Sequence, residues 1–165
     1  MQARYDAAMA TREVTLRPAH LADVELVFQW ANDPVTRAAS FRPAPSAHAE
    51  HVAWFEAQLA RPDRHLRIAA RQGVPFGFLR LDRDANASDR CTLSVNLAPE
   101  ALGRGLGTCV LRAATAEAAR LGFRAIAVLV RPENKASARA FLSGRATWSA
   151  RRWRPARRFV RETTP

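Results

Sequence analysis

Glycines at alternate positions lie just before an alanine-rich helical segment, and they are the residues of this sequence best suited to ligand chemistry. Gly103, Gly105 and Gly107 separate a strand-like segment that ends at Leu97 from this helix. Glycines let the backbone approach a ligand closely, and a helix start offers unpaired N–H groups and the positive end of a dipole. The loop therefore suits a pyrophosphate, although glycines that only allow a tight strand–helix turn would give the same pattern.

Two familiar phosphate-binding motifs do not fit this loop. No Gly-Lys-Ser/Thr follows the glycines, which excludes a P-loop. A dinucleotide-binding fingerprint is disfavoured because about a hundred residues of other structure precede the motif.

The segments around the loop predict an α/β domain. Alternating or short apolar runs predict strands, and apolar residues at helical spacing predict helices. A loop is expected after Asp33-Pro34, to about Ser46. The expected strands are 14–17, 66–71, 76–83, 90–97 and 125–130, and the expected helices are 20–33, 48–60, 105–121 and 133–142.

The composition is typical of one soluble globular domain. The chain has 165 residues, of which 48% are hydrophobic and 25% charged. No apolar run approaches the ~20 residues that span a bilayer, and the first residues lack the apolar core of a signal peptide. Cys91 and Cys109 form neither a disulfide framework nor a metal-ligand pattern. We expect a cytoplasmic protein without a metal ion.

The net charge of +11 suggests a nucleic-acid binder at first sight. However, seven arginines against one glutamate lie in residues 144–165, so this segment carries +6 and the first 143 residues carry +5. More than half of the excess charge belongs to the C-terminal segment, which argues against nucleic acid as the partner.

Two linked motifs and their order along the chain resemble the GNAT acetyltransferase superfamily, over residues 12–143. Leu102, Gly105 and Gly107 fall on the family's Q/R-x-x-G-x-G/A loop, and Asn134 and Phe141 fall on its Asn and Tyr seven positions apart. The resemblance implies an α/β (α+β) single domain, with a mixed sheet of about six to seven strands and about four helices. It also implies transfer of an acetyl group from acetyl-CoA to a primary amine.

The resemblance implies where acetyl-CoA binds. Backbone groups of Val95 and Leu97, where strand 90–97 separates from strand 125–130, would bind the pantetheine arm and polarise the acetyl carbonyl. N–H groups of the glycine loop would hold the pyrophosphate, with Arg104 adding charge. The expected cofactor-binding residues are Val95, Asn96, Leu97, Gly103, Arg104, Gly105, Leu106, Gly107, Thr108 and Asn134.

The reaction that the resemblance implies is direct attack of the amine on the thioester, assisted by positioning and by fixed donors at the oxyanion. Two departures matter. Leu102 replaces a polar residue, which predicts weaker cofactor binding, and Phe141 replaces the Tyr that often protonates the leaving thiolate. Ser137 or water would then serve, or the thiolate leaves unassisted, so Ser137 and Asn134 are the candidate catalytic residues.

The acceptor region, FQWANDPVTRAASF followed by HAEHVAWF, is similar to the branch that acts on nucleotide-linked amino sugars. Trp30, Asn32, Arg37 and His51 are the expected substrate-binding residues, because aromatic rings stack on sugars or bases and arginine pairs with a diphosphate. Each has a simpler interpretation: Trp30 as a core residue, His51 as a surface histidine and Arg37 as a solvated charge.

Other acceptors and other classes stay open. Ribosomal-protein acetyltransferases share a similar opening, so a protein N-terminus is the alternative acceptor. A basic nucleic-acid-binding protein, or a GNAT fold that only binds its cofactor, is the alternative outside the enzyme class. We expect a small-molecule or peptide amine as partner and no membrane, and we leave a homodimer open.

The C-terminal segment departs from the family, which follows its last helix with a Gly–aromatic pair and a final strand. We therefore expect a loose N-terminus over 1–11, the acetyltransferase domain over 12–143 and an atypical arginine-rich segment over 144–165. One hypothesis is a frameshift, because a shift of one nucleotide in SGRATWS permits RAGYVE. The alternatives are a divergent tail in which ARRFVRE forms the missing strand, or a basic arm.

Overall fold

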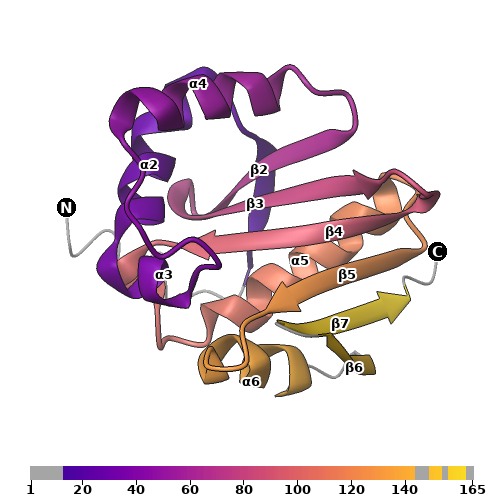
Figure 1. Cartoon of the computed structure of the whole chain (residues 1–165). Helices are drawn as coiled ribbons and strands as arrows, with labels where there is room; N and C mark the ends of the chain where they lie inside the picture. Colours follow the sequence, from indigo (N-terminus) through magenta and orange to yellow (C-terminus); the bar gives the residue numbers. More distant parts are fainter. Residues whose placement is uncertain (1–12, 144–148, 154–155, 163–165) are drawn as a thin grey trace.

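Seven strands form one mixed sheet of order β1-β2-β3-β4-β5-β7-β6 in the computed structural model of the chain (Figure 1). The expected α/β (α+β) class is confirmed. The structure describes residues 13–143, 149–153 and 156–162, so the N-terminal segment 1–11, expected to be loose, lies outside the described residues. None of the helices among the described residues is long and apolar enough to cross a membrane.

The element bounds agree closely with the expected ranges except at one helix. The strands are β1 Thr15–Pro18, β2 Arg64–Arg71, β3 Val74–Asp84, β4 Ala87–Leu97, β5 Ala125–Val130, β6 Ser149–Trp153 and β7 Ala156–Glu162. The α-helices are α2 Val24–Asn32, α3 Pro34–Ala39, α4 His48–Leu59, α5 Leu106–Arg120 and α6 Lys135–Ser143, with short 3-10 turns η1 Leu21–Asp23 and η2 Pro99–Ala101.

Helices α4 and α5 cover opposite faces of the sheet. Phe55 of α4 packs on Phe78 of β3, with ring centroids 5.9 Å apart. Glu117 of α5 instead reaches Arg67 of β2, whose partner in the sheet is Leu79. Because successive strand residues point to opposite faces, the Phe78 and Leu79 sides are different faces. The core therefore lies in two layers, one on each side of the sheet.

Strands β4 and β5 run parallel but pair over only three positions. The pairs are Arg90–Ala125, Cys91–Ile126 and Thr92–Ala127. β4 continues to Leu97 and β5 to Val130, and these continuations do not pair with each other. Figure 1 shows the two arrowheads moving apart on the left-hand side, with α3 beside β4 and α6 beneath β5. This separation opens the sheet at one end.

Helix α3 replaces part of the loop expected after Asp33-Pro34, and that expectation was wrong here. The Asp33 side chain accepts hydrogen bonds from the N–H groups of Val35 and Thr36, and Pro34 occupies the first turn. Asp at the N-cap followed by Pro is a strong helix start, because Pro needs no hydrogen bond there. The same dipeptide therefore ends α2 and begins α3.

Two strands follow α6 in the C-terminal segment. β7 coincides with ARRFVRE and pairs antiparallel with β5 from Ala125–Glu162 to Val130–Arg157, while β6 pairs with β7 at the sheet edge. The backbone thus completes the sheet, as expected for the interpretation with a divergent tail. The frameshift hypothesis concerns the gene and stays a prediction.

An ion-pair cluster fastens α5 to the sheet. Glu117 accepts from Arg120 at 2.8 Å and from Arg67 at 2.7 Å, and its side chain is only 11% exposed. The hydrogen bond from Arg120 has the largest effect on the pKa of Glu117. Together with the bond from Arg67 it lowers this pKa from 4.5 to about 2, although burial alone would raise it. The carboxylate is therefore the form that stabilises the fold.

Replacing Glu117 tests this fastening. We expect Glu117→Gln to lower the free energy of unfolding at pH 7 by about 1 to 3 kcal/mol, because two arginines lose their charged acceptor. The folded pKa lies below the unfolded one, so the contribution is complete above pH 4.5 and disappears as the pH falls towards 2. Urea unfolding of both proteins across this range measures the difference. Glu56→Gln, on the exposed face of α4, is the control, and equal losses in the two variants would contradict the account.

Candidate functional site

The separation of β4 and β5 opens a cleft of about 480 Å³, a size typical of small-molecule sites. Its walls come from α3 and the loop after it, from the ends of β4 and β5, from the start of α5 and from α6. The lining residues are 35–37, 39–41, 92–97, 102, 107, 111, 128–131, 134, 136, 137, 140 and 141. Segments from almost the whole described chain thus meet at one end of the sheet.

The glycine loop connects β4 with α5 beside this cleft. Gly103 and Gly105 have positive φ angles of 72° and 74°, a conformation that L residues with a Cβ adopt only with strain. A Cβ added at either position would meet no atom within 4 Å. The backbone here is therefore shaped by glycine and open to an approaching group. With the first N–H groups of α5, which begins at Leu106, the loop fits an anionic group such as a pyrophosphate.

The structure brings half of the expected cofactor-binding residues to the wall of the cleft. Val95, Asn96, Leu97, Gly107 and Asn134 line it. The other five form the exposed turn and the first turn of α5. They are Gly103, Arg104, Gly105, Leu106 and Thr108, of which Leu106 has its side chain buried in the core, so it offers only its backbone to a ligand.

Asn134 and Ser137 meet at the start of α6. The Asn134 side-chain oxygen accepts a hydrogen bond of 3.0 Å from the Ser137 N–H, which is the geometry of a helix N-cap. Both residues line the cleft, and so does Phe141, one turn further along α6 and 5% exposed. Asn134 therefore stabilises the start of α6 independently of any contact with a ligand.

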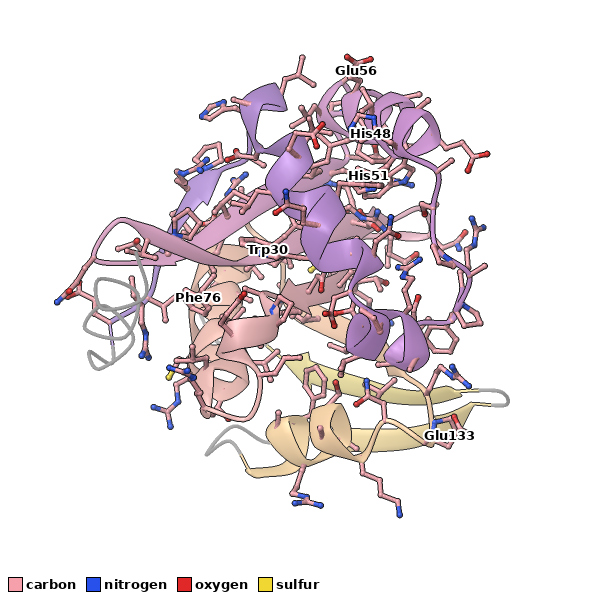
Figure 2. All side chains as sticks on the ribbon, turned by 90° about the vertical axis from the view of Figure 1, so that its left-hand side faces the viewer. Trp30, His48, His51, Glu56, Phe76 and Glu133 are labelled. Carbon is pink, nitrogen blue, oxygen red and sulfur yellow. The ribbon has the colours of Figure 1, made fainter. Side chains whose placement is uncertain are left out.

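Of the four residues expected to bind the acceptor, Arg37 lines the cleft. Trp30 is 5% exposed and belongs to the core. Asn32 exchanges two hydrogen bonds with the backbone of Ser46, which holds the loop between α3 and α4. His51 is buried between Trp54 and Phe55. Figure 2 shows Trp30 near the middle of the molecule and His51 above it, both away from Glu133 at the lower right.

His51 is a buried, uncharged group rather than the expected surface or ligand-binding histidine. Desolvation lowers its pKa below 6.5, and the positive charges of His48 and Arg37 lower it further. Its Nε2 is buried without a hydrogen-bond partner among the described residues. Its ring stacks on Phe55 with centroids 6.2 Å apart. These contacts make His51 part of the packing around α4.

Among the lining residues that were not anticipated from the sequence are Thr36, Phe41 and Arg131. The Thr36 hydroxyl of α3 donates a hydrogen bond of 3.5 Å to the side-chain oxygen of Asn96 in β4. Phe41 presents a half-exposed ring to the cleft. Arg131, at the end of β5, binds the end of α3. The Asp33-Pro34 helix start could have indicated the position of Thr36, but contacts between α3 and β5 have no local sequence signal.

Metal ligation is not a feature of this part of the chain. Among the described residues, no group of three or more His, Cys, Asp or Glu side chains could hold a metal ion. The cleft offers glycines, backbone groups, hydroxyls and arginines instead, a set suited to anionic and amide-containing ligands.

Comparison with known proteins gives one family and many similar folds. The family model for the acetyltransferase (GNAT) domain matches residues 13–143. No curated protein sequence matches the chain. Among solved structures, aminoglycoside acetyltransferase AAC(6')-Ib with paromomycin and acetyl-CoA is 19% identical at a TM-score of 0.79, covering 91% of this chain and 93% of that one.

Two further solved structures share the fold. The Salmonella typhimurium protein yncA, with its cofactor acetyl-CoA, is 22% identical at a TM-score of 0.68, covering 90% of this chain and 92% of that one. The GNAT domain of PAT from S. lividans is 20% identical at a TM-score of 0.73, covering 90% of each chain.

Proposed function

Because the chain belongs to the GNAT acetyltransferase family, we propose that it transfers the acetyl group of acetyl-CoA to a primary amine in the cleft between β4 and β5. The observation that carries this proposal is the separation of the two strands after Thr92 and Ala127. It leaves one edge of β4 unpaired inside a cleft, next to a glycine loop that opens a helix.

The residues present fit acetyl-CoA along its length. The open backbone at Gly103 and Gly105 suits the pyrophosphate, as the lack of atoms near an added Cβ indicates. Backbone groups of Val95 and Leu97 lie on the wall where β4 has no strand partner, which suits the amides of a pantetheine arm. Asn134 lies on the opposite wall, at the start of α6.

Bound acetyl-CoA supplies a thioester, whose C–S bond breaks as the acceptor nitrogen forms an amide. The chain contributes by holding the two reactants together and by presenting fixed donors. Phe141 cannot donate a proton, so the nearby Ser137 hydroxyl is our candidate for protonating the leaving sulfur. Water then returns a proton to Ser137, and the proton lost by the amine goes to solvent.

For the acceptor we propose a nucleotide-linked amino sugar. Arg37 on the cleft wall supports this choice, because a guanidinium suits a diphosphate, and the exposed ring of Phe41 is available for stacking. Trp30 and His51 contribute to the packing of the fold and do not contact the acceptor in this proposal. A protein N-terminus is the second candidate, because the opening segment is also similar to that of ribosomal-protein acetyltransferases. Aminoglycosides, bound by one similar structure, are the third.

A pair of glycine variants tests the cofactor site. Gly105 and Gly73 both have φ near 75° and open space around them, but Gly73 lies in the β2–β3 hairpin. We expect Gly105→Ala and Gly73→Ala to lose a similar stability of about 1 kcal/mol. Only Gly105→Ala should weaken coenzyme A binding, by roughly tenfold or more. Calorimetry with coenzyme A measures this, and no binding to the unchanged protein would defeat the proposal.

A serine variant tests the proton donor. We expect Ser137→Ala to lower kcat by roughly tenfold to a hundredfold, since general acid catalysis contributes effects of this order, while KM for acetyl-CoA stays unchanged. Steady-state kinetics with an amine that the enzyme acetylates gives both constants. Ser46→Ala, outside the cleft lining, is the control. An unchanged kcat in Ser137→Ala would leave water as the donor.

A further inference from the structure

The charges on the cleft wall are all of one sign. Among its lining residues, Arg37 and Arg131 are the charged ones, and no carboxylate lines the cleft. The nearest acidic side chains in these elements are occupied elsewhere. Asp33 caps α3 through two backbone N–H groups, and Glu133 pairs with Arg131 at 3.4 Å. The cleft therefore favours a negatively charged ligand group beside the amine.

Arg131 has a positioning role in this wall. Its Nη1 donates 3.0 Å hydrogen bonds to the carbonyl oxygens of Ala38 and Ser40, which lie 93 and 91 positions earlier in the chain. With Glu133 on its Nε, this guanidinium is largely committed. It fastens the end of α3 to the end of β5 and so fixes the side of the cleft that carries Arg37.

Arg37 keeps most of its binding capacity. Its Nη1 donates to the Ala44 carbonyl oxygen at 3.1 Å, and none of the carboxylates that the structure describes forms an ion pair with it. Its Nε is buried without a partner among the described residues. A buried guanidinium nitrogen without an acceptor is costly. An anion at this guanidinium would supply the missing counter-charge.

Thr36, which precedes Arg37 in the chain, connects α3 to β4, the strand beside which we propose that the acetyl group is transferred. Thr36 bonds to Asn96 of β4 across the cleft at 3.5 Å. Since Arg37 follows Thr36 on α3, an anion bound by Arg37 would lie at the wall of the cleft that α3 forms. The glycine loop and the start of α5, which suit the cofactor pyrophosphate, belong to a different wall.

We propose that Arg37 forms an anion subsite, so that the acceptor is an amine bearing a phosphate or carboxylate group, and polycationic amines are rejected. This inference rests on the proposed function and narrows it. A guanidinium binds either anion through two parallel charge-assisted hydrogen bonds. A polycation would instead be desolvated beside the Arg37 guanidinium, with no carboxylate lining the cleft to compensate, which is unfavourable in a partly buried site.

Binding to the protein saturated with coenzyme A tests this subsite without requiring turnover. Calorimetry compares four probes: 2-amino-2-deoxyglucose, its 6-phosphate, the corresponding uronic acid and kanamycin. We expect at least one anionic probe to bind roughly tenfold or more tightly than the parent sugar, and kanamycin not to bind. The comparison of phosphate with uronate identifies the anion.

Variants connect the preference to Arg37. Arg37→Gln should abolish the advantage of the anionic probes, and Arg37→Lys should restore part of it, with unchanged affinity for coenzyme A. Arg42→Gln is the matched control, because Arg42 is an exposed arginine in the loop after α3 and outside the cleft lining. Thermal unfolding confirms that each variant is folded.

Several results would overturn the subsite: kanamycin binding as tightly as the anionic probes, no binding of either anionic probe, or an unchanged preference in Arg37→Gln. Saturation with coenzyme A is measured first. If coenzyme A does not bind, the proposed function fails; if it binds but the anionic probes show no preference, only this inference fails.

Discussion

Backbone N–H and C=O groups need hydrogen-bond partners, and this need is left open where β4 and β5 stop pairing after Thr92 and Ala127. Each strand keeps its outer neighbour, β3 for β4 and β7 for β5, so both remain straight and ordered as they separate. The facing edges then line a cleft instead of a ladder. A ligand rich in amides can supply the missing hydrogen-bond partners. The other features of the site are therefore arranged around this separation of the two strands.

The walls of the cleft are held by contacts between distant segments. The Asp33 cap starts α3, Thr36 bonds to Asn96, and Arg131 binds the carbonyl groups at the end of α3. On the other side, Asn134 caps α6. Trp30 of α2 and His51 of α4 are buried in the helices before and after α3. The walls of the cleft are therefore held by local caps and one long-range guanidinium, and we propose that the charge of the wall selects the ligand.

The elements that surround the site could be predicted from local patterns, and the contacts between them could not. Gly103 and Gly105 before an alanine-rich helix indicated the loop that we propose binds the cofactor, because positive φ and a helix start are local properties. Helix α3 was missed because Asp33-Pro34 both ends and starts a helix. Trp30 and His51 were expected in the acceptor site, but apolar helical spacing cannot distinguish a core face from a ligand face. The role of Arg131 depends on residues more than 90 positions away.

Amide hydrogen exchange, with and without coenzyme A, tests most directly whether the strand separation is the cofactor site. Binding should slow exchange at Val95 and Leu97 and at residues 103–108, because these backbone groups gain hydrogen-bond partners that the fold does not supply. Exchange in the β2–β3 hairpin around Gly73 should not change. Protection that is absent from both segments, or that appears mainly elsewhere, would contradict the account.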